Sequence, residues 1–209
     1  MHRKQKIHCD IHTGNVLFLS NSIDEFGNCI TISDMGLCGE VENIDETKIY
    51  GVMPYVAPEI LRGNSYTQSA DIYSFGMIMY FVATGRQPFA DFAHDELLAL
   101  EICKGRRPEI DEQKCWDLHL DNRPNVTEIE ELILLFCKSY ENIFAIEDIE
   151  NDEIEKQFKK AEEYRKANIS SFKNNQSVTH PQAIYTSRIL NPFTKNLHNT
   201  ECLDCEIID

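Results

Sequence analysis

The sequence predicts a mainly α-helical domain with one small β-hairpin, and three observations lead to that prediction. Two short apolar segments, 16–20 and 29–33, flank a polar connection that ends in Gly-Asn, as in a hairpin. Residues 70–83 are apolar nearly all round, which is typical of a helix at the centre of a core. Hydrophobic residues make up 42% of the 209-residue chain, which is enough to bury a core.

The helix expected at 70–83 has clear boundary signals. Thr67 or Ser69 can serve as its N-cap, because a side-chain oxygen there accepts from the first free backbone amides. Gly85 is a suitable stop, since glycine readily adopts the left-handed conformation that ends helices. Asp71 is unusual so near the start of an apolar helix, and we expect backbone amides to satisfy its carboxylate.

The chain divides into three regions by composition. Residues 1–138 form the predicted domain and include two further helices, at about 94–104 and about 126–138. Residues 139–168 are interpreted as an acidic linker followed by a charged helix with favourable i,i+4 pairs. Residues 169–209 are rich in Asn, Ser and Thr without a helical or strand period, so we expect a mostly disordered tail.

The charge of the chain limits its partners. The formal net charge is −15, and residues 109–155 alone contribute −12. Such a chain repels nucleic acid and anionic membranes, because binding them requires cationic side chains; the alternative is that the acids only solvate the surface. No apolar run is long enough to span a bilayer. We therefore expect a cytoplasmic protein whose partners are proteins.

The hairpin brings three polar side chains to one point. Asn15 precedes its first arm and Asp34 follows its second, while Asp10 lies on the loop that leads to the same place. The run from His8 to Asn15 fits the pattern H-x-D-x-x-x-x-N. Phosphoryl transfer uses this set: one carboxylate orients the attacking hydroxyl, while an Asn and a second Asp hold Mg²⁺. Each residue alone is more simply a loop residue, but the constellation predicts phosphoryl transfer.

These motifs resemble the catalytic loop and metal-binding motif of eukaryotic protein kinases. Small-molecule kinases of the aminoglycoside phosphotransferase type share the first motif, so the sequence downstream has to distinguish the two. It contains, in order, Gly-Val-Met-Pro-Tyr-Val-Ala-Pro-Glu59, Asp71-Ile-Tyr-Ser-Phe-Gly, Cys-Trp-Asp and Asp-Asn-Arg123-Pro. Over residues 1–138 this series resembles the C-terminal lobe of a protein kinase, closest to the tyrosine-kinase-like group.

The resemblance implies ATP and Mg²⁺ as cofactors and assigns roles in their chemistry. Asp10 resembles the catalytic base. Asn15 and Asp34 resemble the Mg²⁺ ligands. Leu17 matches the apolar residue beneath the adenine ring, with plain core packing as the alternative.

The resemblance also assigns structural positions. Glu59 and Arg123 match a buried ion pair, and Asp71 matches the helix residue that anchors the catalytic loop, of which His8 is a structural part. The segment from Asp34 to Glu59 resembles the activation segment. Its candidate phosphorylation sites are two hydroxyls that are otherwise unmodified loop residues, Thr47 and Tyr50.

Several family features are not matched. The sequence has no G-x-G-x-x-G loop, no ATP-gripping Lys and no partner Glu, so the N-terminal lobe is absent from the resemblance. The family has a helix where only residues 111–114 remain. Cys9 stands where the family's His-Arg-Asp motif has Arg. His12 and Val52 stand where serine/threonine kinases have Lys and Thr, so both polar supports of Asp10 are expected to be missing. These replacements leave open whether Ser/Thr or Tyr is the acceptor.

We therefore expect a protein kinase family member of intracellular signalling. By resemblance, it transfers phosphate from ATP to Ser, Thr or Tyr of a protein substrate, but the isolated chain is expected to be inactive alone. The alternatives are a non-catalytic, pseudokinase-like scaffold that binds a signalling partner, or a gene-model fragment of a complete kinase.

Overall fold

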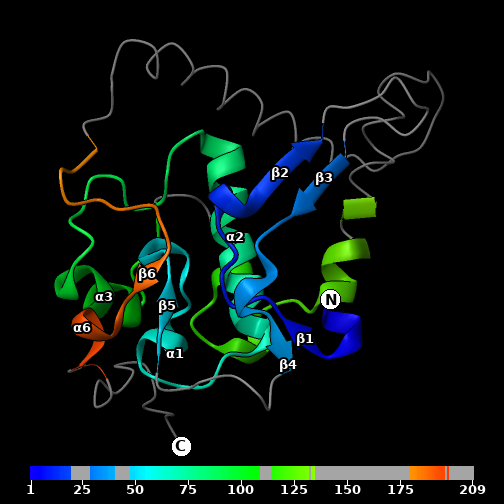
Figure 1. Cartoon of the computed structure of the whole chain (residues 1–209), viewed down its shortest axis with the longest axis horizontal. Coiled ribbons are helices and arrows are strands. Elements are labelled where there is room, and N and C mark those ends of the chain that lie inside the picture. Colours follow the sequence, from blue (N-terminus) through cyan, green and yellow to red (C-terminus); the bar gives the residue numbers. More distant parts are fainter. Residues whose placement is uncertain are drawn as a thin grey trace, which may run out of the picture.

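Helix α2 (Gln68–Thr84) runs through the middle of the structure, and the other elements pack around it (Figure 1). Its predicted signals are confirmed: the Thr67 hydroxyl accepts from Ala70 N at 3.2 Å, and Gly85 ends the helix at φ 70°. The computed structural model describes residues 1–19, 29–40, 48–108, 114–131, 133–134, 179–195 and 197.

The predicted hairpin is confirmed by strands β2 (Val16–Leu19) and β3 (Cys29–Ile32), which pair antiparallel (Figure 1). Val16 lies opposite Ile32 and Leu19 lies opposite Cys29. Because the arms are matched in length, the residues just before β2 and just after β3 come to the same end of the hairpin.

The helices after α2 differ in detail from the prediction. Helix α3 (Glu96–Cys103) begins two residues later than expected, because the Asp95 carboxylate caps the amides of residues 97 and 98 at 3.0 and 3.2 Å. It packs against the short helix α1 (Pro58–Leu61). Residues 126–131 and 133–134 are helical. The expected end of that helix at 138, the expected linker and helix at 139–168, and residues 111–113 of the short connection lie outside the described residues.

Residues 114–116 cross α2 at a point where only glycine fits. A Cβ at Gly76 would lie 2.8 Å from Cys115 Cβ, closer than real side chains approach. Trp116, the next residue, is 4% exposed and packs on Tyr80 with ring centroids 6.2 Å apart. The described 3₁₀ turns are His2–Lys4, Thr13–Asn15, Met35–Leu37, Met53–Tyr55, Lys114–Trp116 and Leu120–Asn122.

The C-terminal region departs most from the sequence prediction. Within the expected loose tail 169–209, residues 179–195 and 197 pack on the rest of the described structure, and Leu190 and Leu197 are 0% and 2% exposed. The polar composition predicted disorder for the segment alone, but these apolar side chains bury against the rest of the molecule. Helix α6 (Asn191–Thr194) packs against α3 (Figure 1).

Two further strand pairs have no signal in the local sequence. Strand β1 (Lys6–Ile7) pairs antiparallel with β4 (Gly39–Glu40), and β5 (Tyr50–Gly51) pairs antiparallel with β6 (Arg188–Ile189). Each strand has two residues, too few to display an alternating pattern.

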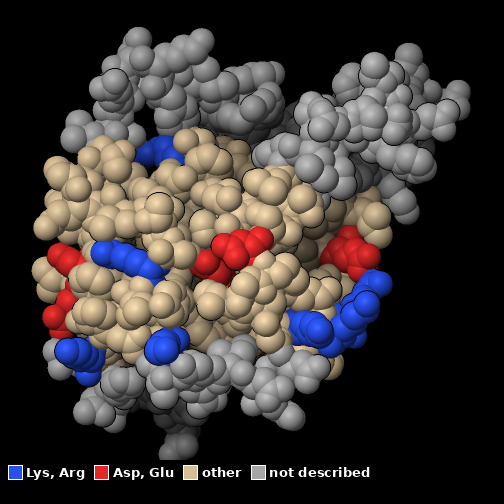
Figure 2. All heavy atoms as spheres, viewed as in Figure 1, with Lys and Arg blue, Asp and Glu red and all other residues tan. Residues whose placement is uncertain are grey.

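The surface is mixed in charge where the structure describes it. Figure 2 shows Lys and Arg side chains in separate places on the face toward the viewer, with acidic side chains among them. Among the described residues, no helix is long and apolar enough to cross a membrane.

A buried ion pair joins α1 to the loop before the helical residues 126–131. Two Arg123 nitrogens donate to the Glu59 carboxylate at 2.7 and 2.9 Å, and these side chains are 0% and 4% exposed. Arg123 also donates to the carbonyls of Asp117 and Ser69, and its guanidinium lies 5.3 Å from the Tyr73 ring centroid. The charge is thus fully compensated by a bidentate partner and two carbonyls.

We predict that Glu59→Gln destabilises the fold by about 3 to 5 kcal/mol, because it leaves the buried Arg123 charge without its anion. The matched control is Glu101→Gln, which breaks an exposed pair with Arg106 and costs less than about 1 kcal/mol. Urea denaturation followed by circular dichroism measures both. Equal losses in the two variants would contradict the structural importance of the buried pair.

Candidate active site

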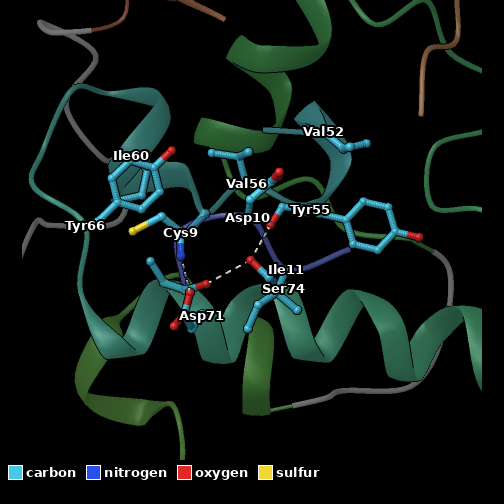
Figure 3. Close-up of a pocket in the computed structure, with 12 residues that line it drawn as sticks. Cys9, Asp10, Ile11, Val52, Tyr55, Val56, Ile60, Tyr66, Asp71 and Ser74 are labelled. Atoms are coloured by element: carbon cyan, nitrogen blue, oxygen red, sulfur yellow. Dashed lines mark hydrogen bonds between the residues drawn. The ribbon is translucent and has the colours of Figure 1, made fainter. Parts of the chain in front are cut away.

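The loop before β2 is anchored by a carboxylate from α2. Asp71 accepts from His8 N at 2.8 Å and from Cys9 N at 3.1 Å, and His2 Nε2 lies 2.8 Å from the same carboxylate. Figure 3 shows Asp71 on α2 directly beneath Cys9. Cys9 has φ 68°, a left-handed conformation that costs energy for a residue with a Cβ. The two charge-assisted bonds hold the loop in this strained form.

Asp10 follows directly and is fixed on both sides. The side-chain amide of Asn15 donates to Asp10 O at 2.9 Å, so the two ends of the motif are tied together. Gly51 lies beside the carboxylate: a Cβ there would be 3.7 Å from Asp10 Oδ1 and 2.7 Å from Val56 Cγ2. Gly51 also has φ 143°, so glycine is required for backbone geometry and for space. Asp10 itself is 7% exposed.

His12 supplies a polar neighbour that the sequence interpretation missed. Its Nδ1 accepts from Gly14 N at 3.1 Å, which leaves the ring proton on Nε2, 3.8 Å from Asp10 Oδ2. Burial lowers the pKa of His12, against the opposing pull of the Asp10 and Asp34 carboxylates. The neutral ring is therefore a hydrogen-bond donor beside Asp10, where we had expected polar support to be missing. The sequence signal for this role of His12 was its position two residues after Asp10.

The hairpin brings Asp34 to the same end as Asn15. Ser33 N donates to Asn15 O at 2.8 Å, and His8 Nε2 lies 3.1 Å from Ser33 O. Asp34 follows with φ 60°, and its Oδ1 accepts from Gly36 N at 3.3 Å. Asp34 is exposed.

The residues at this end fit a magnesium site completed by phosphate. No group of three or more His, Cys, Asp or Glu in the described part of the chain could hold a metal by itself. Mg²⁺ in phosphoryl transfer is held by one or two protein side chains together with phosphate oxygens. Asn15, whose NH₂ group is directed to Asp10 O, and the exposed Asp34 carboxylate supply oxygens of this kind.

Leu17 and the two candidate phosphorylation sites are placed differently. Leu17 is 43% exposed on β2, so the described residues do not bury it in a core. Tyr50 is half-buried in β5, opposite Ile189. Thr47 lies outside the described residues.

A small cavity lies beneath the anchored loop and is not the substrate site. Figure 3 shows its walls, with Asp10 and Cys9 on the loop side and Ser74 of α2 donating to Tyr55 O at 2.6 Å. Its volume is about 10 Å³, room for one water molecule. Burial raises the pKa of the Cys9 thiol to about 12, so this buried thiol is uncharged and unreactive.

The comparisons with known proteins agree with this geometry. Residues 1–140 match the protein kinase domain family, and the chain therefore belongs to the protein kinase family.

Three relatives illustrate the similarity. The chain is 31% identical to serine/threonine-protein kinase/receptor R831 of Acanthamoeba polyphaga mimivirus, over 65% of its own length and 9% of the relative. It is 31% identical to serine/threonine-protein kinase gdt4 of Dictyostelium discoideum, over 67% of its own length and 9% of the relative. It is also 31% identical to dual specificity protein kinase shkA of Dictyostelium discoideum, over 63% of its own length and 28% of the relative. The chain thus spans a small part of these relatives.

We predict that Asp71→Asn loosens the loop at His8 and Cys9. An amide has one acceptor oxygen, so a backbone amide of residues 8–9 is left buried without its partner, which costs about 1 to 3 kcal/mol. Hydrogen exchange of these two amides is expected to accelerate by about tenfold or more.

The matched control is Asp95→Asn, which changes a carboxylate that also accepts from two backbone amides, at the exposed N-cap of α3. Asn is as good an N-cap as Asp, so little change is expected there. If both variants lost the same stability, or if the His8 and Cys9 amides stayed protected in Asp71→Asn, the anchoring role would be refuted.

Proposed function

We propose that this chain supplies the C-terminal lobe of a kinase that transfers the γ-phosphoryl group of ATP to serine or threonine hydroxyls of proteins. One observation carries the proposal: the Asp10 carboxylate accepts a hydrogen bond from the aliphatic hydroxyl of Ser187. This is the contact that a catalytic base makes with an acceptor alcohol. The relatives described as serine/threonine kinases support the same acceptor class.

The side chains around Asp10 suit the steps of this reaction. Asp10 orients the acceptor oxygen and takes its proton as the oxygen attacks. His12 keeps its Nε2 proton toward the same oxygen and donates to it. Asn15 and Asp34 present oxygens at the adjoining end of the hairpin, where they would hold Mg²⁺. When bound, Mg²⁺–ATP supplies the phosphoryl group and neutralises the charge of its oxygens.

We infer that the 209-residue chain by itself binds ATP weakly. Its sequence contains no G-x-G-x-x-G loop to cover the phosphates, and the exposed Leu17 provides only one face for an adenine ring. Positioning and electrostatics contribute most of the catalysis in phosphoryl transfer, so loss of the phosphate grip reduces the rate strongly.

A second candidate function is a non-catalytic binding module. The observation that favours it is the coverage of Asp10 by Ser187 of the same chain, which leaves the carboxylate in contact with its own polypeptide. Such a module would capture a protein partner without needing Asp10 or Asp34.

We predict that, in the presence of a kinase N-terminal lobe fused before residue 1, Asp10→Asn lowers phosphate transfer to a serine peptide by about 10²- to 10⁴-fold. Asp34→Asn is expected to abolish Mg²⁺-dependent ATP binding measured by calorimetry. Asp117→Asn, in a loop away from the site, serves as the control and should leave phosphate transfer and Mg²⁺-dependent ATP binding unchanged.

The 209-residue chain alone should show no ATP binding in the micromolar range in the same calorimeter. Micromolar binding by this chain would overturn the inference about its nucleotide affinity. Unchanged phosphate transfer in Asp10→Asn would reject the kinase proposal, and partner capture that survives both substitutions would favour the binding module.

A further inference from the structure

Ser187 uses both hydrogen-bonding functions of its hydroxyl on the active-site loop. Its Oγ donates to Asp10 Oδ2 and lies 3.4 Å from His12 Nε2, which carries the ring proton. An acceptor hydroxyl about to be phosphorylated needs the same two contacts: a base for its proton and a donor beside its oxygen. The contact joins residues that are 177 positions apart in the chain.

The backbone that follows Ser187 is held as an added strand. Arg188 lies opposite Gly51 and Ile189 opposite Tyr50 in the β5–β6 pair. The pairing is extended by Leu190 N, which donates to Ile49 O at 2.8 Å. Strand addition of this kind binds extended peptides through main-chain hydrogen bonds and therefore places little demand on sequence.

His94 binds the backbone that precedes Ser187. This buried ring, 2% exposed, contacts Phe89 O through Nε2 at 3.3 Å, and its Nδ1 lies 2.9 Å from Ile184 O and 3.0 Å from Ile184 N. Burial lowers its pKa, while its hydrogen bonds to the Ile184 and Phe89 carbonyls oppose that shift. Tyr185 packs edge-on against the ring, with centroids 4.8 Å apart, and donates to Pro88 O at 2.9 Å.

The side chains after Ser187 are also received by specific groups. Arg188 donates to His94 O at 2.7 Å, and its guanidinium lies 4.6 Å from the Phe193 ring centroid. Leu190, three residues after Ser187, is fully buried. The surface thus accepts an aromatic residue two positions before the serine, a basic residue one position after it and an apolar residue three positions after it.

We propose that residues 182–190 occupy the peptide-substrate site in cis, with Ser187 in the acceptor position. The inference rests on the proposed function and deepens it. It assigns the substrate class as an extended serine peptide with the features Tyr–x–Ser–Arg–x–Leu. Because the segment belongs to the same chain, its binding is intramolecular, and an external substrate must displace it.

The test introduces a second carboxylate beside Asp10. Ser187→Glu replaces a donor with an anion next to a carboxylate that is 7% exposed, so repulsion should release the segment. Hydrogen exchange of the Leu190 amide is expected to accelerate by about tenfold or more. Thr186→Glu adds the same charge at an exposed neighbouring residue and is the matched control, with little change expected.

A double variant separates this charge contact from general packing. In Asp10→Asn with Ser187→Glu, the new amide can donate to the new carboxylate, so protection of the Leu190 amide should return. Two results would overturn the placement of Ser187 on Asp10. One is that Ser187→Glu accelerates exchange of the Leu190 amide no more than Thr186→Glu does. The other is that adding Asp10→Asn does not restore the protection of that amide.

Peptide binding tests whether the vacated surface recognises the proposed substrate class. A fluorescent peptide with the sequence of residues 182–192 should bind the Ser187→Glu chain about tenfold or more tighter than the unmodified chain, because the internal competitor is released. Equal affinities would overturn the proposal. Neither measurement requires ATP, so a chain that fails the nucleotide and transfer assays can still confirm the peptide site, and the two failures are distinguishable.

Discussion

The carboxylate of Asp71 is the interaction on which the rest of the site depends. It reaches from the central helix to two successive backbone amides and so holds Cys9 in a left-handed conformation. The next residue along the loop is Asp10, whose side chain is 7% exposed. The buried Asp71 carboxylate needs hydrogen-bond donors, and the backbone amides of His8 and Cys9 need acceptors. Because each satisfies the other, the surroundings maintain the strained loop.

Two kinds of constraint meet at Asp10. From below, the anchored loop and the Asn15 amide fix the main chain on both sides of the carboxylate. On the other side, Gly51 allows strand β5 to approach the carboxylate closely, because any larger residue would collide with Val56. The same glycine lies opposite the residue that follows Ser187. One close approach therefore brings the Asp10 carboxylate beside the strand that pairs with the residues after Ser187.

The sequence predicted the parts of the fold that carry local signals. The N-cap and glycine stop of α2, and the matched arms of the hairpin, were visible because neighbouring residues determine them. Asp71 was conspicuous because a carboxylate in an apolar helix needs donors. By contrast, the docking of residues 179–195 depends on partners far away along the chain, and their polar composition indicated disorder. The sequence interpretation considered only the Lys that His12 replaces. The role of His12 in the structure depends on which ring nitrogen accepts the hydrogen bond from Gly14 N.

The β5–β6 pair also has a consequence for the order of folding. It joins strands about 140 positions apart, and Ser187 lies 177 positions from Asp10. Contacts of such long range form late, because closing a long loop costs entropy before the contacts can compensate. The loop at His8–Asn15, by contrast, is held by residues of the first half of the chain. During synthesis, the site therefore exists in an open form before its own C-terminal segment arrives to cover it.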